Sequence, residues 1–253
     1  MFADPAFYLV SIPAVLLYGV AKGGWGGATA VLAVPLMSLA MPPTQAAAIL
    51  LPILVVMDVL VLKTYWGVYD CRALKLLLPW ALLGVGLGYL TAEVMNEHYM
   101  RLLIGGISLV FGLQYLIDLK SRASAEHHAG SAGFFGTLAG FTSFSIHAGG
   151  PPFSVYLMPK QLPPLIYAGT AGVFFAVVNF VKLVPYYSLG QFSSDNLLYS
   201  IVLVPLAPLG VKLGHYLVRH SDSDFYYKVI SFFLVVVGAK LTHDGWVGLG
   251  QAV

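Results

Sequence analysis

The chain has 253 residues, of which 58% are hydrophobic and only 9% are charged, and its net charge is +2. A soluble domain carries about a quarter charged residues, so this composition indicates an integral membrane protein. The small net charge argues against a nucleic-acid partner. The lone cysteine, Cys71, excludes a disulfide within the chain and a cysteine zinc site. The N-terminus lacks the basic region and cleavage site of a secretory signal, so we expect the first apolar segment to be retained.

The apolar runs predict a polytopic bundle of membrane helices. They do not alternate apolar and polar residues as barrel strands do, which favours an all-α membrane protein. Because a span needs roughly 20 apolar residues, the candidate full spans are 44–64, 73–92, 99–118, 164–187, 196–217 and 226–242. Two longer regions, 6–41 and 132–159, are cut by glycines. We expect each of them to form two short helices, which either re-enter the membrane or cross it at a tilt.

An internal repeat relates the two halves of the chain. The segment PLMSLAMPPTQAA at 35–47 returns as YLMPKQLPPLIYA at 156–168, with Leu-Met, Pro-Pro and a final Ala at a constant offset of 121. Chance similarity between apolar runs would not keep these pairs in one register. The sequence therefore predicts a first transmembrane repeat at 1–118, a connecting cytoplasmic loop at 119–131 and a second transmembrane repeat at 132–253.

The distribution of basic residues predicts that the repeats have opposite orientations. Loops 63–75, 118–130 and 158–164 contain lysine or arginine, whereas 41–44 and 188–196 contain neither. By the positive-inside rule, the first three face the cytoplasm and the other two face outward. Because repeat-equivalent loops fall on opposite sides, we expect an inverted repeat with both termini outside the cytoplasm. Secondary transporters often have this arrangement and bind substrate at interrupted helices between the repeats.

Two glycine-rich breaks are the candidate substrate site: KGGWGG at 22–27 and SFSIHAGGPP at 143–152. Broken backbone at membrane depth is tolerated only where it is buried in protein or lines a polar cavity. A helix that starts after each break would aim free N–H groups and its positive end at the gap, which suits an anion. The predicted substrate-binding residues are Lys22, Gly23, Gly24, Gly26, Gly27, Ser145, His147, Gly149, Gly150, Asn179 and Lys182.

Each polar residue in these spans also has a structural interpretation. Lys22 contacts the ligand or snorkels from a helix end, and His147 is a ligand and proton carrier or a packing residue. Asp58 and Asn179 are matched at the offset of 121, and Lys182 shares a helix face with Asn179. Asp58 either joins His147 in proton coupling or serves as the partner of an internal lysine, and we favour the partner role. The sequence shows no cofactor, metal or catalytic motif.

The whole chain resembles the sulfite exporter TauE/SafE family of bacterial inner-membrane proteins. The residues that carry the resemblance are GVAKGGWGGATAVLAVPLMSLAMPP, its echo GFTSFSIHAGGPPFSVYLMPKQLPP and the duplicated layout. The resemblance implies transport, usually outward, of sulfur-containing anions such as sulfite, sulfonates or sulfoacetate. The residues alone indicate an anion transporter in the lipid bilayer and leave a homo-oligomer open. An anion channel of the same architecture and a membrane enzyme using His147 with Asp58 are the alternatives.

The predicted topology can be tested with reporter fusions at positions 68, 125 and 192. We expect these fusions to report the cytoplasm, the cytoplasm and the outside, respectively, because only the first two loops carry basic residues. The same reading from positions 68 and 192 would show that the repeats are not inverted.

Overall fold

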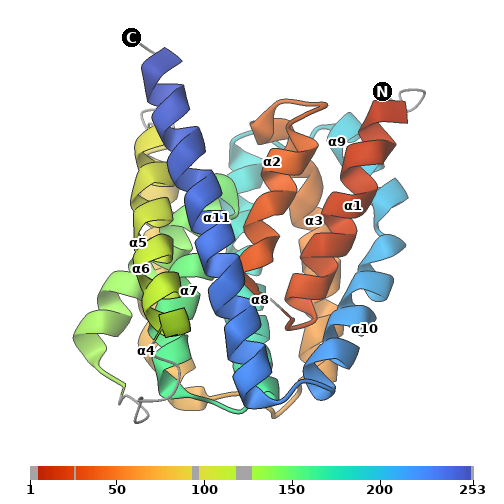
Figure 1. The fold of residues 1–253 in the computed structure, drawn as a ribbon. Coiled ribbons are helices and arrows are strands. Elements are labelled where there is room, and N and C mark those ends of the chain that lie inside the picture. Colours follow the sequence, from red (N-terminus) through yellow and green to blue (C-terminus); the bar gives the residue numbers. More distant parts are fainter. Residues whose placement is uncertain (1–4, 26, 93–96, 118–126, 252–253) are drawn as a thin grey trace.

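The fold is a bundle of helices (Figure 1), known from a computed structural model that describes residues 5–25, 27–92, 97–117 and 127–251. Most of the predicted connecting loop, 119–131, lies outside these residues, and so does Gly26. The start of α1 and the end of α11 lie at the same end of the bundle in Figure 1. This agrees with termini on one side of the membrane, while the inverted orientation of the repeats stays a prediction.

The helices follow the order expected from the repeat. In the first half they are α1 (Pro5–Lys22), η1 (Gly27–Leu32), α2 (Ala33–Met37), α3 (Pro43–Thr64), α4 (Cys71–Leu90) and α5 (Glu97–Ile117). In the second half they are α6 (Ala129–Ile146), α7 (Gly150–Leu157), η2 (Met158–Lys160), α8 (Pro164–Ser188), α9 (Ser194–Leu203), α10 (Leu206–Arg219) and α11 (Ser223–Gln251). The η elements are 3₁₀ helices.

Five described helices, α1, α3, α4, α8 and α11, are long and apolar enough to cross a membrane. As expected, the region 6–41 is divided at its glycines into α1 and the shorter η1 and α2, and α1 is by itself a candidate span of 18 residues. The predicted single span at 196–217 is instead two helices, α9 and α10, bent by 48°. Pro205 sits at the bend, where its missing N–H removes a helical hydrogen bond.

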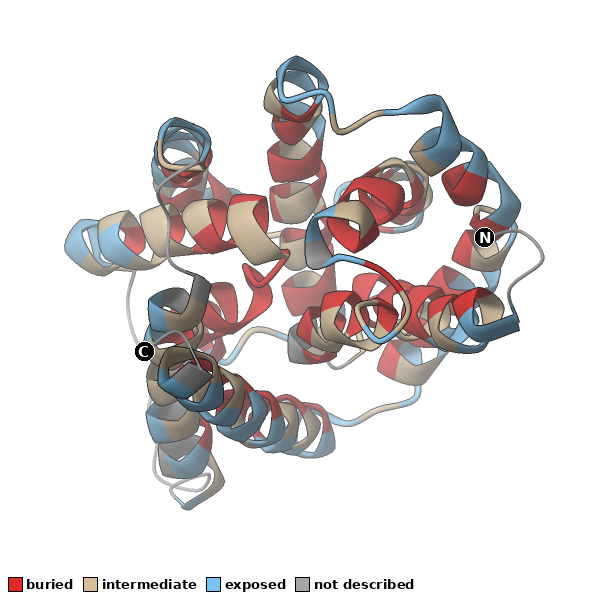
Figure 2. Ribbon diagram, turned by 90° about the horizontal axis from the view of Figure 1, so that it is seen from above, coloured by how far each residue is buried: buried red, intermediate tan, exposed pale blue. Residues whose placement is uncertain are grey.

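The outer surface of the bundle is apolar, as a lipid-facing surface must be. Seen from above, buried residues gather where helices face one another and exposed residues lie on the outward faces (Figure 2). Those outward residues include Leu9, Leu90 and Val184, each exposed by more than 70%. Such large exposed apolar areas would be unusual on a soluble monomer, but they are favourable in lipid.

The packing of the helices follows the internal repeat. α4 packs along α6. In the second half, the region equivalent to α4 forms α9 and α10, and the first-half helix equivalent to α6 is α1. α10 packs along α1, so the α4–α6 contact has its counterpart. α3 packs against its own equivalent α8, and α5 packs against its equivalent α11. Exchanging the two halves therefore leaves the set of helix contacts unchanged. The offset of 121 residues that relates the two halves of the sequence therefore also relates the main helix contacts of one half to those of the other.

Local sequence signals set several helix starts. α3 and α8 each begin at the second proline of a Pro-Pro pair. At the first helical position the fixed φ of proline suits a helix and no N–H bond is lost. Asp70 caps α4 by accepting hydrogen bonds from the N–H groups of Arg72 and Ala73. Its other oxygen lies 3.0 Å from Nε2 of His127. This contact ties the start of α4 to the described end of the connecting loop.

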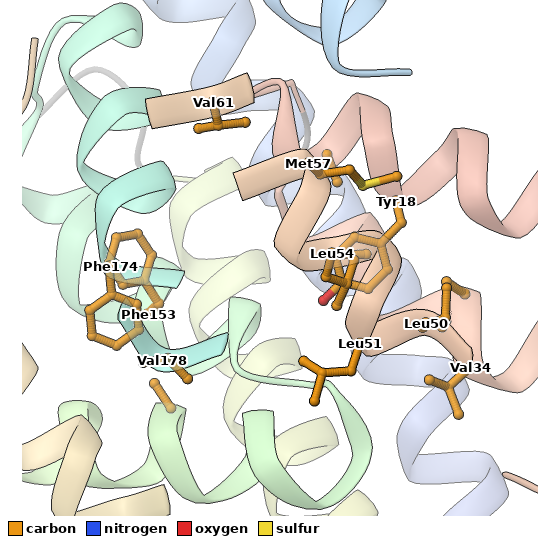
Figure 3. Packing of buried hydrophobic residues seen from close by; sticks show 14 of the residues in the cluster. Tyr18, Val34, Leu50, Leu51, Leu54, Met57, Val61, Phe153, Phe174 and Val178 are labelled. Carbon is orange, nitrogen blue, oxygen red and sulfur yellow. The ribbon is translucent and has the colours of Figure 1, made fainter. Parts of the chain in front are cut away.

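The apolar core lies between α1, α3, α7 and α8. Figure 3 shows Leu54 and Met57 of α3 next to the ring of Tyr18 from α1. It also shows Phe153 of α7 beside Phe174 of α8, with ring centroids 4.8 Å apart. These side chains are buried, and they surround the polar residues described below.

Glycines allow the closest helix crossings. A Cβ on Gly84 of α4 would lie 2.1 Å from the carbonyl oxygen of Thr137 on α6. A Cβ on Gly140 of α6 would lie 1.9 Å from the carbonyl oxygen of Ala81 on α4. Neither position has room for a side chain, because the contacting atoms are backbone. Small residues at such crossings let membrane helices approach closely.

Gly84→Ala should therefore lower stability, whereas Gly86→Ala two residues away should not. Nothing lies within 4 Å of a Cβ at Gly86, so the substitution adds only helix propensity. At Gly84 the helices must separate, which costs about 1–3 kcal/mol. Thermal unfolding of the purified variants in detergent measures both effects. Equal unfolding midpoints for the two variants would contradict the close α4–α6 crossing.

Candidate functional site

A buried ion pair joins the end of α1 to the middle of α3. The ammonium of Lys22, the last residue of α1, donates to Oδ1 of Asp58. Asn179 of α8 donates to the other carboxylate oxygen at 2.7 Å. Asp58 is completely buried and Lys22 is 7% exposed. Lys22 therefore does not snorkel to the membrane surface. Asp58 is its ion-pair partner, while a part of Asp58 in proton coupling stays a prediction.

A second buried lysine has only neutral neighbours in the described structure. The Lys182 ammonium donates to the carbonyl oxygen of Ser143 at 3.0 Å and to its hydroxyl at 3.2 Å. It also lies 3.1 Å from Nδ1 of His147. Lys182 has no exposed surface. Two lysines and one aspartate are thus buried close together, so the centre of the bundle holds one more basic than acidic side chain.

His147 connects this second lysine to the α3 backbone. An ammonium has no lone pair, so the contact with Lys182 assigns Nδ1 as the acceptor and Nε2 as the N–H of a neutral ring. Nε2 lies 3.3 Å from the carbonyl oxygen of Ala47 and 3.3 Å from the hydroxyl of Tyr186. The Tyr186 hydroxyl donates onward to the carbonyl oxygen of Phe144 at 3.0 Å, which leaves its lone pair free for His147.

A small cavity of about 40 Å³ lies beside these groups. Its polar lining comes from Tyr18, Lys22 and His147. The other lining residues are Ala21, Ala30, Gly150, Ala171, Gly172 and Phe175. The Lys22 ammonium lies 5.5 Å from the centroid of the Phe175 ring, within the range of a cation–π interaction. Lys182 does not line the cavity itself but contacts His147, which does.

The two repeats contribute matched residues to this centre, with one difference in charge. Asp58 and Asn179, which hydrogen-bond to each other, are 121 residues apart. The residue 121 positions after Lys22 is Ser143, which contacts Lys182. The first repeat therefore has a Lys/Asp pair where the second has Ser and Asn. Lys182 has no basic counterpart in the first repeat, because its equivalent there is Val61.

Tyrosines satisfy the carbonyl groups that the breaks leave free. Tyr65 donates to the carbonyl oxygen of Gly23 at 2.6 Å, and its repeat equivalent Tyr186 donates to the equivalent residue, Phe144, at 3.0 Å. Tyr226 of α11 donates to the carbonyl oxygen of Gly24 at 2.7 Å. The backbone at both breaks is therefore buried in protein, one of the two conditions under which it is tolerated in a membrane.

The structure brings together five of the predicted charged and polar residues: Lys22, Asp58, His147, Asn179 and Lys182. Gly150 joins them in the cavity wall. These positions agree with the site expected from the two breaks, and their role as ligands stays a prediction.

Other predicted residues lie against protein rather than at the cavity. A Cβ on Gly23 would lie 2.4 Å from the carbonyl oxygen of Val211, and Gly24 has φ +109°. Gly149 is equally tight, with the carbonyl oxygen of Ala139 2.6 Å from a Cβ. The Ser145 hydroxyl donates to the carbonyl oxygen of Phe141 in its own helix. Gly27 starts η1, and Gly26 lies outside the described residues.

The helix ends at the site differ from the sequence-based expectation. The first break is followed by the 3₁₀ helix η1 rather than by an α-helix. After the second break, α7 begins with Gly150, Pro151 and Pro152, and the prolines supply no N–H. The C-terminal ends of α1 and α6, which carry partial negative charge, meet at the centre beside the start of α7. Lys22 and Lys182 lie at these ends and complement that charge.

Sequence reasoning did not select Ser143, Tyr18, Tyr186 or Phe175 for the site. The repeat register could have found Ser143, because it is the equivalent of Lys22, and Tyr186, because it matches Tyr65. Tyr18 and Phe175 lie in ordinary apolar stretches and carry no such signal.

Comparison with protein families agrees with this architecture. A family model described as Sulfite exporter TauE/SafE matches residues 11–241, most of the chain. The chain belongs to the TauE/SafE family. No curated protein and no solved structure gave a match. Membership in this transporter family and the apolar helices together identify a multi-pass membrane protein that transports anions.

The dependence of stability on the buried Lys22–Asp58 pair can be tested in this TauE/SafE protein by substitution. Asp58→Asn should destabilise the protein by about 3–5 kcal/mol, because it leaves Lys22 buried without a counter-charge. Combining it with Lys22→Ser reproduces the Ser and Asn of the second repeat and should restore most of that loss. The measurement is the midpoint of thermal unfolding for the single and double variants. A double variant less stable than Asp58→Asn alone would show that the two charges do not depend on each other.

Proposed function

We propose that this protein is a secondary transporter that exports a small sulfur oxyanion, with sulfite as the best fit, across the bacterial inner membrane. The observation that carries the proposal is the excess of basic over acidic side chains at the centre: Lys22, which lines the cavity, and Lys182 are buried near one carboxylate, Asp58. A buried charge is costly unless it is paired. An anion beside Lys22 and His147 would supply the missing negative charge.

The size of the cavity supports a small substrate. A volume of about 40 Å³ has room for a few water molecules or one ion of a few heavy atoms. Sulfite has four heavy atoms, whereas sulfoacetate and taurine carry additional carbon atoms and a second polar group. A pocket of this small size among packed helices also supports a carrier more than an open channel.

The membrane potential is sufficient to drive export. With the inside negative, an anion that moves outward gains about 2.3 kcal/mol per charge per 100 mV. No coupling ion is needed for this direction. Because no described group of three or more His, Cys, Asp or Glu could hold a metal ion, we assign the driving force to potential and concentration, modulated by protonation of His147.

The function is tested by sulfite flux in proteoliposomes. The Lys22→Ser/Asp58→Asn double variant should fold but lose at least about tenfold in flux, because it removes the cation that lines the cavity. Lys75→Gln, an exposed lysine at the start of α4, is the control and should keep the wild-type rate. Competition should be stronger with sulfite than with sulfoacetate or taurine. A folded double variant with wild-type flux would contradict the proposal.

The role of His147 is tested by the pH dependence of the same flux between about pH 5.5 and 8, the range in which a free histidine titrates. Protonation at Nδ1 would remove the acceptor of the Lys182 hydrogen bond and add a third cation near the cavity. We therefore expect the ratio of His147→Ala flux to wild-type flux to change across this range. Sulfite also titrates here, so the ratio of variant to wild-type flux is compared at each pH. A constant ratio would exclude histidine from the mechanism.

A further inference from the structure

A second pocket, separate from the cavity at Lys22, lies between α3 and α10 where both helices end. Its volume is about 240 Å³, and its polar lining is mostly basic. The side chains that carry charge or can gain it are Lys212, His215, Arg219 and His220, with Thr64 opposite them at the end of α3. No aspartate or glutamate belongs to the lining among the described residues. We call this pocket the α3–α10 groove.

The groove opens on the lipid-facing side of the bundle. Leu209, Leu213 and Tyr216 of α10 are each more than half exposed, and α10 lies at the edge of the bundle in Figure 1. Lys212 is seven residues before Arg219, the last residue of α10, which places it roughly 10 Å inside the helix end. An exposed cation at that depth is costly in hydrocarbon unless it reaches polar groups or an anion.

The groove is not an extension of the central cavity. The backbone of α10 at Val211 and Gly214 packs directly on Gly23, where a Cβ would lie 2.4 Å and 2.8 Å from their atoms. This tight crossing separates the groove from Lys22. A ligand in the groove would therefore be held outside the central site.

His215 has unused hydrogen-bonding capacity at the groove. Its Nδ1 is buried and has no hydrogen-bond partner among the described residues. Its ring packs edge-on against Tyr65, with centroids 5.0 Å apart, which fixes its orientation. A buried polar atom without a partner is costly. A phosphate oxygen in the groove would accept a hydrogen bond from Nδ1–H as well as pairing with the neighbouring cations.

We propose that the α3–α10 groove binds the phosphate headgroup of an anionic phospholipid, whose acyl chains lie along the exposed apolar face of α10. Basic pockets between membrane helices on the cytoplasmic side bind such headgroups, and the groove lies at the end predicted to face the cytoplasm. A free oxyanion has the same charge chemistry but lacks the acyl chains that the apolar face would contact. The site is independent of the anion that the protein transports.

The test compares purified full-length variants in detergent, without any transport substrate. Lys212→Gln/Arg219→Gln removes two exposed charges of the groove, and Arg72→Gln/Lys75→Gln removes two exposed charges of α4 as the matched control. Phosphatidylglycerol and phosphatidylcholine are added separately, and lipid binding is measured by native mass spectrometry together with thermal unfolding. Wild type and control should bind phosphatidylglycerol in preference to phosphatidylcholine. The groove variant should bind phosphatidylglycerol more weakly than the wild type by a factor of roughly ten or more.

Two results would overturn the proposal. One is a groove variant that binds phosphatidylglycerol as tightly as the control does. The other is a combination of two observations. Inorganic phosphate or sulfate alone stabilises the wild type but not the groove variant, and the wild type shows no preference between the two lipids. That second result would assign the groove to a free anion. A His215→Phe variant gives an independent check, because it removes the hydrogen-bond donor and keeps both exposed charges.

Discussion

The structure depends on the burial of the Lys22–Asp58 ion pair inside a membrane bundle. Neither charge can leave for water, so the three helices that carry Lys22, Asp58 and Asn179 must stay together. The cost of desolvating such a pair is recovered only with good geometry and with further hydrogen bonds to the carboxylate. Asn179 supplies one of these from the helix that is the repeat equivalent of α3. The pair therefore fixes the contact between the two halves of the chain.

The repeat then explains why the centre is both symmetric and charged. Matched tyrosines, Tyr65 and Tyr186, donate to matched carbonyl groups, so the two breaks share this hydrogen bond although different kinds of helix follow them. The charges do not follow this symmetry. Ser143 and Asn179 replace the Lys/Asp pair in the second half, and Lys182 adds a cation without a matching carboxylate. A symmetric scaffold therefore carries an asymmetric set of charged side-chain types, two lysines and one aspartate.

The glycine-rich breaks serve this arrangement by packing rather than by lining the cavity. Gly23 lets α1 end against α10, where a Cβ would collide with the backbone, and Gly24 adopts a φ of +109° that favours glycine. This close crossing brings the last residue of α1, Lys22, to the level of Asp58. The same crossing separates the central cavity from the basic groove on the outside of α10. One small structural feature therefore positions the buried cation and keeps the two anion-attracting regions apart.

The sequence by itself determined the membrane class, the duplication and the identity of the central polar residues. Apolar length and repeat register are read along the chain, and a lysine or aspartate within an apolar span stands out because its burial is costly. Only the tertiary structure decided that Lys22 pairs with Asp58, that Lys182 contacts His147, and that α1 is a full span. These outcomes depend on contacts between residues 35 or more positions apart. The 3₁₀ helix after Lys22 likewise was not predicted from the sequence, whereas the bend between α9 and α10 has a local cause in Pro205.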